Sequence, residues 1–570
     1  MDLVIERRAA RGNEITDLAM HPVLRRAYAA RGVCDSQELA LTLDRLMPVG
    51  TLDCVDAAVV LILAHRERRI LVVGDFDADG ATSTALIVRC LRAWGFASVD
   101  FLVPNRFEFG YGLTPEIVGL AAERNPSLII TVDNGISSNA GVAAARARGI
   151  QVLVTDHHLP GPSLPDADVI VNPNVPGSRF GSRALAGVGV AFYVMAAVRR
   201  EIDARGMVVM PPVTDFLDLV ALGTVADLVP LDVNNRVLVA QGIRRIRAGR
   251  AVPGIRALLE IGKRSVSALT AADLGFTIGP RLNAAGRLDD MSIGIRCLLA
   301  DTEAEALALA TRLDELNVER REIEARMQGV ALAAVKGLRE PDANAPTRHG
   351  VCLFDAGWHQ GVVGLVASRI KDRVRRPVIA FARNADGSLR GSARSVPGIH
   401  IRDVLDGIAT RHPELISRFG GHAMAAGLSL EERHLDAFAR AFDQEVARWR
   451  DPSIPSNLVE TDGELSSEEI ALETAQALRD GGPWGQAFPE PCFDGVFAIR
   501  NARVVGDKHL KMWVTTADQS RNFDAIAFNF KGADDVLDLP SGDVRLVYRL
   551  DINEYKGERR LQLLVDHVLP

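Results

Sequence analysis

The segment RILVVGDFDADGATS, residues 69–83, decides the fold of this chain, because an unbroken apolar run leads straight into acidic residues. The letters ILVV are typical of a strand that is buried on both faces of a parallel sheet. Three aspartates follow the run: Asp75, Asp77 and Asp79. The segment therefore predicts a buried strand whose carboxyl end carries acidic side chains.

The same pattern recurs twice farther along the chain. LIITVDNG at 128–135 ends in Asp133, and QVLVTDHH at 151–158 ends in Asp156, His157 and His158. Stretches with helical spacing of apolar residues separate these runs, which indicates an α/β unit with a parallel sheet. A further acid, Asp227, follows the apolar segment FLDLVALGTVA.

The carboxyl ends of parallel strands share one edge of a sheet, so these acids and histidines are expected to meet there. Each piece alone has a plainer explanation, since a single Asp after a strand is usually a helix cap or turn residue, and a His-His pair is often a surface feature. Their conjunction favours a metal site, because so many carboxylates repel one another without cations. Oxygen ligands with imidazole suit Mn²⁺ or Mg²⁺, and two ions are expected.

The rest of the chain divides by composition and periodicity. The N-terminal part reads as helical, with HPVLRRAYAARG and DSQELALTLDRLM as helices, and residues 301–340 read as one long helix or two end to end. The last hundred residues alternate with period two and predict a five-stranded barrel of the OB type. The expected segments are 1–66 (helical), 67–300 (metal-binding α/β), 301–345 (connecting helix and linker), 346–450 (second α/β region) and 456–570 (β domain).

Composition sets broad limits on the class of protein. A formal charge of −7 argues against nucleic-acid binding through overall positive charge, although it leaves a local basic channel open. The six cysteines are scattered without metal-site or disulfide spacing, which favours a reducing compartment. The N-terminus is charged and the chain has no apolar run of about 20 residues. A cytoplasmic protein without membrane segments is expected.

The motifs resemble a known superfamily. GDFDADGATS, VDNGIS, TDHH and ADLVPL look like the ordered motifs of the DHH phosphoesterases, and GGHAMAAGLS at 420–429 looks like the motif of their associated DHHA1 domain. PNRFEFGYGLT, GPRLNAAGRL, GWHQGVVGLVASRI and GSARSVPG narrow the resemblance to the RecJ family of single-stranded-DNA exonucleases. This resemblance runs through nearly the whole chain and implies DHH, DHHA1 and OB-like domains.

The resemblance also implies roles for residues in the cluster. The implied metal ligands are Asp75, Asp77, Asp79, Asp133, His157 and Asp227. Asp133 is expected to bridge two ions, and Asp156 to orient a ligand from the second shell. His158 is expected to contact the scissile phosphate or assist the leaving group. The expected catalytic residues are thus Asp77, Asp133, His157 and His158.

DNA phosphates require arginines, hydroxyls and backbone N–H groups. The candidates for these contacts are Arg106, Arg281, Arg287, His359, Ser392, Arg394, Gly420, Gly421 and His422. Any one of these arginines can equally form a structural ion pair, and His359 can equally serve a turn. The family resemblance implies a pocket for a terminal 5′-phosphate, built by the second α/β region. Phe109 stands where RecJ-like chains usually carry an acid, which puts a detail of that pocket in doubt.

The resemblance thus implies a 5′→3′ exonuclease that hydrolyses single-stranded DNA with two metal ions, in DNA repair and recombination. A DHH phosphodiesterase acting on short oligonucleotides, cyclic dinucleotides or pyrophosphate is an alternative. A catalytically inactive DNA-binding scaffold is another, although every expected ligand is present. By resemblance alone, a single-strand-binding protein and a helicase are expected partners, and the chain is expected to be a monomer.

Overall fold

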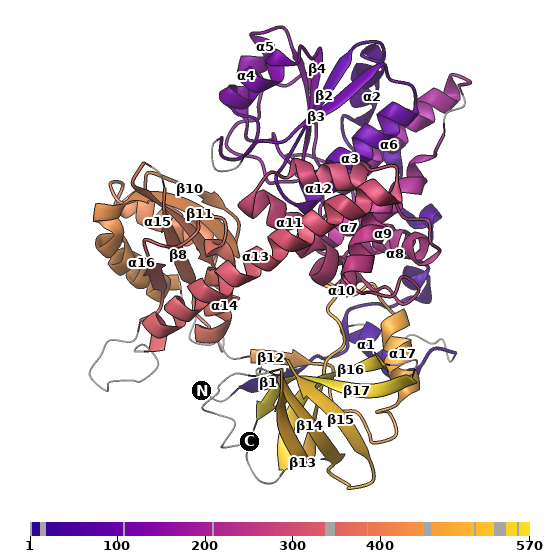
Figure 1. Cartoon of the computed structure of the whole chain (residues 1–570), viewed down its shortest axis with the longest axis vertical. Coiled ribbons are helices and arrows are strands. Elements are labelled where there is room, and N and C mark those ends of the chain that lie inside the picture. The colour runs from indigo at the N-terminus through magenta and orange to yellow at the C-terminus, as the bar shows by residue number, and fades with distance from the viewer. Residues whose placement is uncertain are drawn as a thin grey trace. The chain divides into compact units, whose positions relative to one another are not determined.

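The structure is a computed structural model that describes residues 3–11, 19–105, 109–207, 210–336, 348–384, 386–449, 458–506, 509–528, 530, 543–555 and 558–569 (Figure 1). The chain separates into two compact units. The first contains residues 1–5 and 315–459 and is here called the DHHA1 unit after the domain expected in it. The second contains residues 6–314 and 460–570 and is here called the catalytic unit after the expected metal site. The two units are described separately.

The catalytic unit contains a parallel sheet in the order β3-β2-β4-β5-β6 among the described residues. Its strands are β2 (Arg69–Gly74), β3 (Ser98–Leu102), β4 (Leu128–Val132), β5 (Gln151–Thr155) and β6 (Val169–Val171). β2, β4 and β5 consist mainly of fully buried aliphatic residues, since helices cover both faces. The predicted parallel α/β sheet is confirmed.

The two faces of this sheet are covered by different helices (Figure 1). Leu71 and Val73 of β2 pack in one apolar cluster with residues of α4 (Pro115–Glu123) and α5 (Asn139–Arg146). On the other side lie α3 (Ala78–Ala93) and α6 (Gly187–Ala204), which contact each other and the strands.

Further helices complete the catalytic region. They are α7 (Leu217–Ala226), α8 (Val233–Arg247), α9 (Pro253–Ile261), α10 (Ala271–Asp273), η5 (Leu274–Ile278), α11 (Gly279–Leu288), α12 (Ser292–Leu299) and α13 (Glu303–Lys336). The Asn283 side chain of α11 accepts a hydrogen bond from the Ala78 N–H, 2.8 Å away. A Cβ at Gly286 would collide with the carbonyl oxygen of Phe76. Helix α11 therefore packs directly against the loop that carries the three aspartates. Within the expected 301–340 region, the described residues Glu303–Lys336 form one helix, α13.

The N-terminal part differs from the prediction. It begins with a strand, β1 (Val4–Arg7), and its α-helices are α1 (Pro22–Ala30) and α2 (Val55–Ala64). The predicted helix over DSQELALTLDRLM is wrong, because 3₁₀ turns at Ser36–Leu39 and Leu43–Arg45 take its place, followed by another at Val49–Thr51. Leu41 and Leu46 pack against Val237 and Ala240 of α8, and this tertiary contact outweighs the helical spacing.

The DHHA1 unit contains a mixed sheet in the order β10-β11-β9-β8-β7 among its described residues. Its elements are β7 (Val351–Phe354), α14 (Val363–Val374), β8 (Val378–Arg383), β9 (Ser388–Arg394), α15 (Ile401–Arg411), β10 (Arg418–Gly421), β11 (Ala425–Glu431), η6 (Glu432–His434) and α16 (Leu435–Trp449). One face packs on α15 and α16 in a core that includes Phe381, Phe438 and Phe442. Helix α14 packs against β8 and β9.

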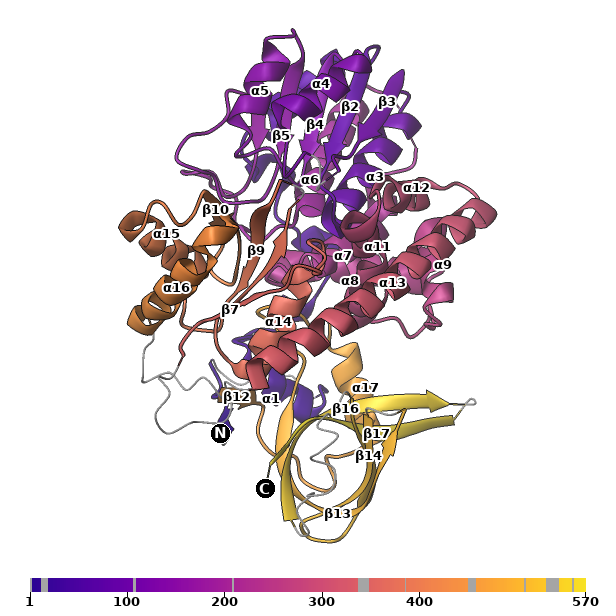
Figure 2. The ribbon, with the colours of Figure 1, turned by 60° about the vertical axis from the view of Figure 1, so that its left-hand side comes forward.

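The C-terminal residues form a closed barrel in the order β13-β14-β15-β17-β16, preceded by β12 (Leu458–Thr461) and α17 (Leu472–Asp480). Its strands are β13 (Phe493–Val505), β14 (His509–Thr516), β15 (Asn522–Ala527), β16 (Asp543–Tyr555) and β17 (Glu558–Leu569). Figure 2 shows the strands closing into a ring. Phe493, Phe497 and Tyr548 fill its interior, whereas Trp513 and Phe528 are exposed. The predicted five-stranded barrel is confirmed.

Within the described residues, no single helix has the length and apolar composition needed to cross a membrane, although the bent pair 43–51 and 55–64 meets both criteria together.

Candidate metal centre

The sheet order brings the sequence motifs together at one edge. β4 lies between β2 and β5, so Asp133 lies between the aspartates that follow β2 and the Asp-His-His run that follows β5. Asp227 reaches the same place from the carboxyl end of α7, whose last helical residue is Ala226. The order of the strands therefore brings these side chains to the same edge of the sheet, as the sequence predicts.

The first-motif aspartates are held by the start of helix α3. Asp77 is the N-cap, and its Oδ1 accepts hydrogen bonds from the backbone N–H groups of Asp79 and Gly80, both 3.0 Å away. Asp79 accepts hydrogen bonds from the N–H groups of Gly187 (2.6 Å) and Val188 (2.9 Å) at the start of α6. Two helix N-termini thus support these carboxylates with N–H groups and positive dipole ends.

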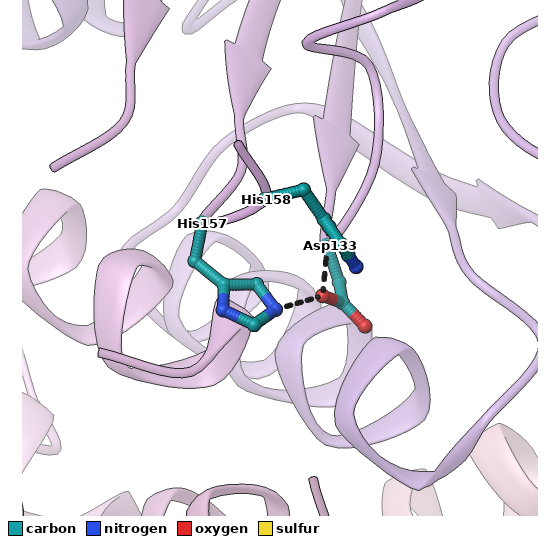
Figure 3. A group of neighbouring side chains, drawn as sticks. All are labelled: Asp133, His157 and His158. Carbon is teal, nitrogen blue, oxygen red and sulfur yellow. Dashed lines mark ion pairs between the residues drawn. The ribbon is translucent and has the colours of Figure 1, made fainter. Parts of the chain in front are cut away.

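Three groups of side chains have ligand atoms close enough to share a cation, all within 4.8 Å of one another in each group. They are Asp75, Asp77 and Asp133; Asp79, His157 and Asp227; and Asp133, His157 and His158. His157 Nε2 lies 3.1 Å from Asp133 Oδ1 (Figure 3). The same nitrogen lies 3.4 Å from Asp227 Oδ2. Asp133 and His157 each belong to two groups, so the groups describe adjacent positions rather than separate sites.

Burial makes this cluster costly in the absence of cations. Burial, and then the charge of Asp77, raise the pKa of Asp79 to about 7. The pKa values of Asp133 and Asp227 are raised well above the ordinary value by burial and then by neighbouring carboxylates, Asp79 first. Asp133 Oδ1 is buried and accepts no hydrogen bond from the described residues. Divalent cations would offset both the charge repulsion and the missing contact.

The donor set fits a hard divalent cation. Carboxylate oxygens predominate, His157 adds imidazole, and no cysteine belongs to any of the three groups among the described residues. This combination suits Mn²⁺ or Mg²⁺ better than a metal that prefers thiolate.

Asp156 supports the cluster without joining any ligand group. Its Oδ1 accepts hydrogen bonds from the N–H groups of His157 (2.7 Å) and His158 (3.1 Å) and from His158 Nδ1 (2.7 Å). Its Oδ2 accepts from the Ile136 N–H at 2.9 Å. Burial would lower the pKa of His158, but the hydrogen bond and charge of Asp156 outweigh it and raise that pKa to about 9. Asp156 therefore fixes the two histidines in place and favours a protonated His158.

The predicted phosphate contacts in the catalytic unit have mixed placements. Arg281 donates through Nε to Asp314 at 2.9 Å and through Nη1 to the Thr277 carbonyl oxygen at 2.6 Å, so a structural role accounts for its position. Arg287 lies in the last turn of α11 and is partly buried. Arg106 lies outside the described residues. Phe109 packs at the margin of the apolar cluster formed by β2, α4 and α5.

The remaining candidates lie together in the DHHA1 unit. Arg394 donates to Ser392 Oγ at 3.0 Å, and a Cβ at Gly364 in the first turn of α14 would lie 2.9 Å from both side chains. Strand register places Gly420 opposite Gly427, which in turn lies opposite Ser392. The structure thus collects Ser392, Arg394 and the Gly-Gly-His hairpin at one place.

Backbone geometry and hydrogen bonds account for Gly421, His422 and His359 at their positions in the DHHA1 unit. Gly421 has φ of +143°, and a Cβ at this position would lie 2.5 Å from the Ala425 carbonyl oxygen, so the hairpin requires glycine. The His422 N–H donates to the same oxygen at 2.8 Å. His359 is in the turn before α14, where its Nδ1 accepts from the Gly361 N–H at 3.1 Å. That contact matches the turn role left open for His359.

Comparison with known proteins decides the family. Family models match the DHH family N-terminal domain at 69–224, the DHHA1 domain at 348–448 and the RecJ OB domain at 461–567. The chain is 53% identical over 559 residues to the single-stranded-DNA-specific exonuclease RecJ of Salmonella typhimurium, covering 96% of each chain. It is 52% identical over 577 residues to that of Escherichia coli, covering 99% of each. The chain belongs to the RecJ family.

Solved RecJ structures agree with this assignment. RecJ from Thermus thermophilus in complex with Mn²⁺ matches with a TM-score of 0.79 and 30% identity, over 99% of this chain and 80% of that one. An exonuclease RecJ bound to manganese matches with a TM-score of 0.59 and 35% identity, over 71% of this chain and 98% of that one. A further RecJ structure contains Mg²⁺. Mn²⁺ or Mg²⁺ is accordingly the cofactor of this RecJ-family centre.

Some residues of the RecJ-family site were missed by sequence reasoning. The Tyr111 hydroxyl donates to the Asp133 carbonyl oxygen at 3.1 Å and lies 3.2 Å from His158 Nδ1. Asn174 donates to the His157 carbonyl oxygen at 2.6 Å, and Asn172 donates to that of His158 at 2.9 Å. A signal existed for the asparagines, because VNPN follows the fourth apolar run as the acids follow the others. Tyr111 stands between two glycines, which was its only signal.

Replacing Asp156 by asparagine is expected to lower kcat about 10- to 100-fold, as removal of outer support for metal ligands commonly does. The amide cannot accept the Ile136 N–H through its nitrogen, and it removes the charge that keeps His158 protonated. The decline of activity at alkaline pH should therefore move to lower pH, which a pH–rate profile measures.

Asp168→Asn is the matched control for this variant. Asp168 also accepts a backbone N–H, that of Val152 at 2.8 Å, but it precedes β6 at the opposite end of the sheet. Its profile should equal that of the unaltered protein. An Asp156→Asn profile that keeps its alkaline limb in place would contradict the assigned role.

Proposed function

We propose that this chain is a metal-dependent 5′→3′ exonuclease that hydrolyses single-stranded DNA to nucleoside 5′-monophosphates. The observation that carries the proposal is the sharing of Asp133 and His157 between adjacent ligand groups at the sheet edge. Membership of the RecJ family supports single-stranded DNA as the substrate.

The ligand groups indicate which residues would hold each of two cations. Asp75, Asp77 and Asp133 would hold one cation, and Asp79, His157 and Asp227 would hold the second. Bound cations supply Lewis acidity at the phosphate and lower the pKa of a water molecule. Asp133 would connect the two positions, because its Oδ1 lies 3.1 Å from Nε2 of His157, which would hold the second cation. Asp77 and Asp79 are kept in place by backbone N–H groups, which limits their movement as charge develops.

His158 is proposed to act on the scissile phosphate rather than as a ligand. Its Nδ1 is occupied by Asp156 at 2.7 Å, and its pKa is raised to about 9. A protonated imidazole can donate to a phosphate oxygen or protonate the leaving oxygen. Tyr111, beside the same ring, would limit the orientations that His158 can adopt.

We propose that the DHHA1 unit binds the terminal 5′-phosphate through Ser392, Arg394 and the Gly420–His422 hairpin. Proximity of a hydroxyl, a guanidinium and open backbone at glycines supports this role. Arg106, Arg281, Arg287 and His359 stay as predictions for further phosphate contacts. The five sequence segments stay as proposed domain bounds, and the family-model matches support the last two of them closely.

The test uses the full chain with Mn²⁺ and a 5′-phosphorylated single strand labelled internally, beside a blunt duplex and a dinucleotide. Mononucleotides should be released from the 5′ end of the single strand while the duplex stays intact. Digestion that starts at the 3′ end would overturn the polarity. Turnover of the dinucleotide alone would favour the short-oligonucleotide phosphodiesterase, and binding without hydrolysis would favour the inactive scaffold.

The finer partner assignments are also proposals. A single-strand-binding protein and a helicase are proposed partners, a monomer is the proposed state, and the cytoplasm is the proposed location because the proposed substrate is DNA. Sedimentation of the chain with and without a single-strand-binding protein tests the binding of that partner and the monomeric state.

A further inference from the structure

The sheet of the DHHA1 unit has two faces of opposite character. Along β9 the residues alternate between buried and partly exposed, and the buried set packs in the core with α15 and α16. The other set consists of Ser388, Arg390, Ser392 and Arg394. Because side chains on a strand point alternately to opposite faces, these four share the face away from the core.

Strand register extends this face into a cross-strand row two residues from Ser392. Arg390 of β9 lies opposite Ser429 of β11, and Ser429 lies opposite Arg418 of β10. The three side chains therefore stand side by side across three strands, with two arginines flanking a hydroxyl. Burial lowers the pKa of the Arg390 guanidinium, and the positive charge of Arg418 lowers it further.

The floor beside this row is open. Gly427 and Gly420 occupy the neighbouring row, and both are exposed. A Cβ at Gly420 would meet no described atom within 4 Å, and one at Gly427 would meet only the Gly391 carbonyl oxygen at 4.0 Å. Helix α14 packs on β8 and β9, whereas Arg418 and both glycines are exposed. An elongated ligand can therefore lie over the glycines and reach both rows.

Three arginines, Arg390, Arg394 and Arg418, lie on this face of the sheet. The described residues of β9, β10 and β11 include one acid on this face, Glu431, and it pairs with Arg433 at 2.7 Å. Arg390, Ser429 and Arg418 thus present hydrogen-bond donors at neighbouring positions on three adjacent strands. Guanidinium and hydroxyl groups are the donors that phosphate oxygens accept.

We propose that Arg390, Ser429 and Arg418 form a second phosphate-binding row that holds an internal phosphate of single-stranded DNA. The row lies two residues, about 6.8 Å, along the sheet from the Ser392 row proposed for the terminal phosphate. That separation is comparable to one nucleotide step of an extended strand. The proposal rests on the proposed function, and it adds to it a contact that grips the strand independently of its 5′ end.

The test measures binding of a fluorescent 12-nucleotide strand to the full chain in Ca²⁺ by anisotropy, across a range of salt concentrations. Arg418→Gln and Arg390→Gln are each expected to weaken binding about tenfold. Each should also reduce the slope of log affinity against log salt by about 0.7, the value for one lost phosphate contact on a single strand. The loss should be the same for a 5′-hydroxyl strand, because the row binds an internal phosphate.

Arg440→Gln is the matched control, since Arg440 is an exposed arginine on α16, which packs on the other face. It should leave affinity and salt slope unchanged. Thermal melting confirms that each variant is folded. The proposal would be overturned if Arg418→Gln weakened binding of 5′-phosphorylated strands but not of 5′-hydroxyl strands. The row would then bind the terminal phosphate. Equal affinities for all variants would overturn it too. A wild-type chain that binds but degrades no DNA would instead contradict the proposed function.

Discussion

Replacing Asp133 by asparagine is expected to lower the exonuclease rate at least about a thousandfold. Asp133 belongs to the Asp75–Asp77 ligand group, and its Oδ1 also lies 3.1 Å from His157 Nε2, so the change is expected to disturb both proposed cation positions. A thousandfold corresponds to about 4 kcal/mol of transition-state stabilisation, within what bound cations supply to a phosphodiester reaction.

The same change should stabilise the metal-free protein. Asp133 is buried, and its pKa is raised well above the ordinary value by burial, Asp79 and Asp77. An uncharged amide of nearly the same shape removes that repulsion. Activity and metal-free stability should therefore move in opposite directions, which simple misfolding cannot produce.

The measurement pairs initial rates in Mn²⁺ with melting temperatures in EDTA. Asp100→Asn is the control, because Asp100 lies on β3 of the same sheet but pairs with Arg124 on the surface. That variant should retain full activity. If the Asp133→Asn protein kept more than a tenth of the original rate, a role for Asp133 as a metal ligand would be excluded.

Stability of the metal-free chain is expected to fall as pH rises from about 4 to about 7. Asp79 has its pKa raised from 3.8 to about 7, first by burial and then by Asp77. Between these two values the folded state binds more protons than the unfolded state, so raising the pH favours unfolding. The shift corresponds to on the order of 4 kcal/mol, which is a large part of the stability of a typical domain.

Divalent cations should reverse this trend. They bind the ionised carboxylates of the folded state, so added Mn²⁺ should raise the melting temperature most at pH 8 and least at pH 5. Melting curves at both values, with EDTA or Mn²⁺, measure the difference. Asp79→Asn should flatten the pH dependence in EDTA. A metal-free protein that is equally stable at pH 5 and pH 8 would contradict the assigned electrostatics.

The sequence by itself determined the parallel sheet and the edge at which the chemistry lies. Runs such as ILVV and LIITV can be buried on both faces only in a covered parallel sheet, and the ends of parallel strands share an edge whatever the loop details. For this reason Asp75, Asp133 and His157 could be placed together from spacing alone. The barrel was predictable for a similar reason, since period-two alternation needs only local information.

Only the tertiary structure decided which partner each side chain takes. Asp156 and Asp133 both follow buried strands, but the N–H groups around Asp156 donate to its oxygens, whereas Asp133 Oδ1 accepts no hydrogen bond from the described residues. Arg281 was a phosphate candidate by motif, and a contact with Asp314, 33 residues away, engages it. Helical spacing over 36–47 was overridden by Leu41 packing on α8. Such outcomes depend on contacts between distant segments, and periodicity carries no information about those contacts.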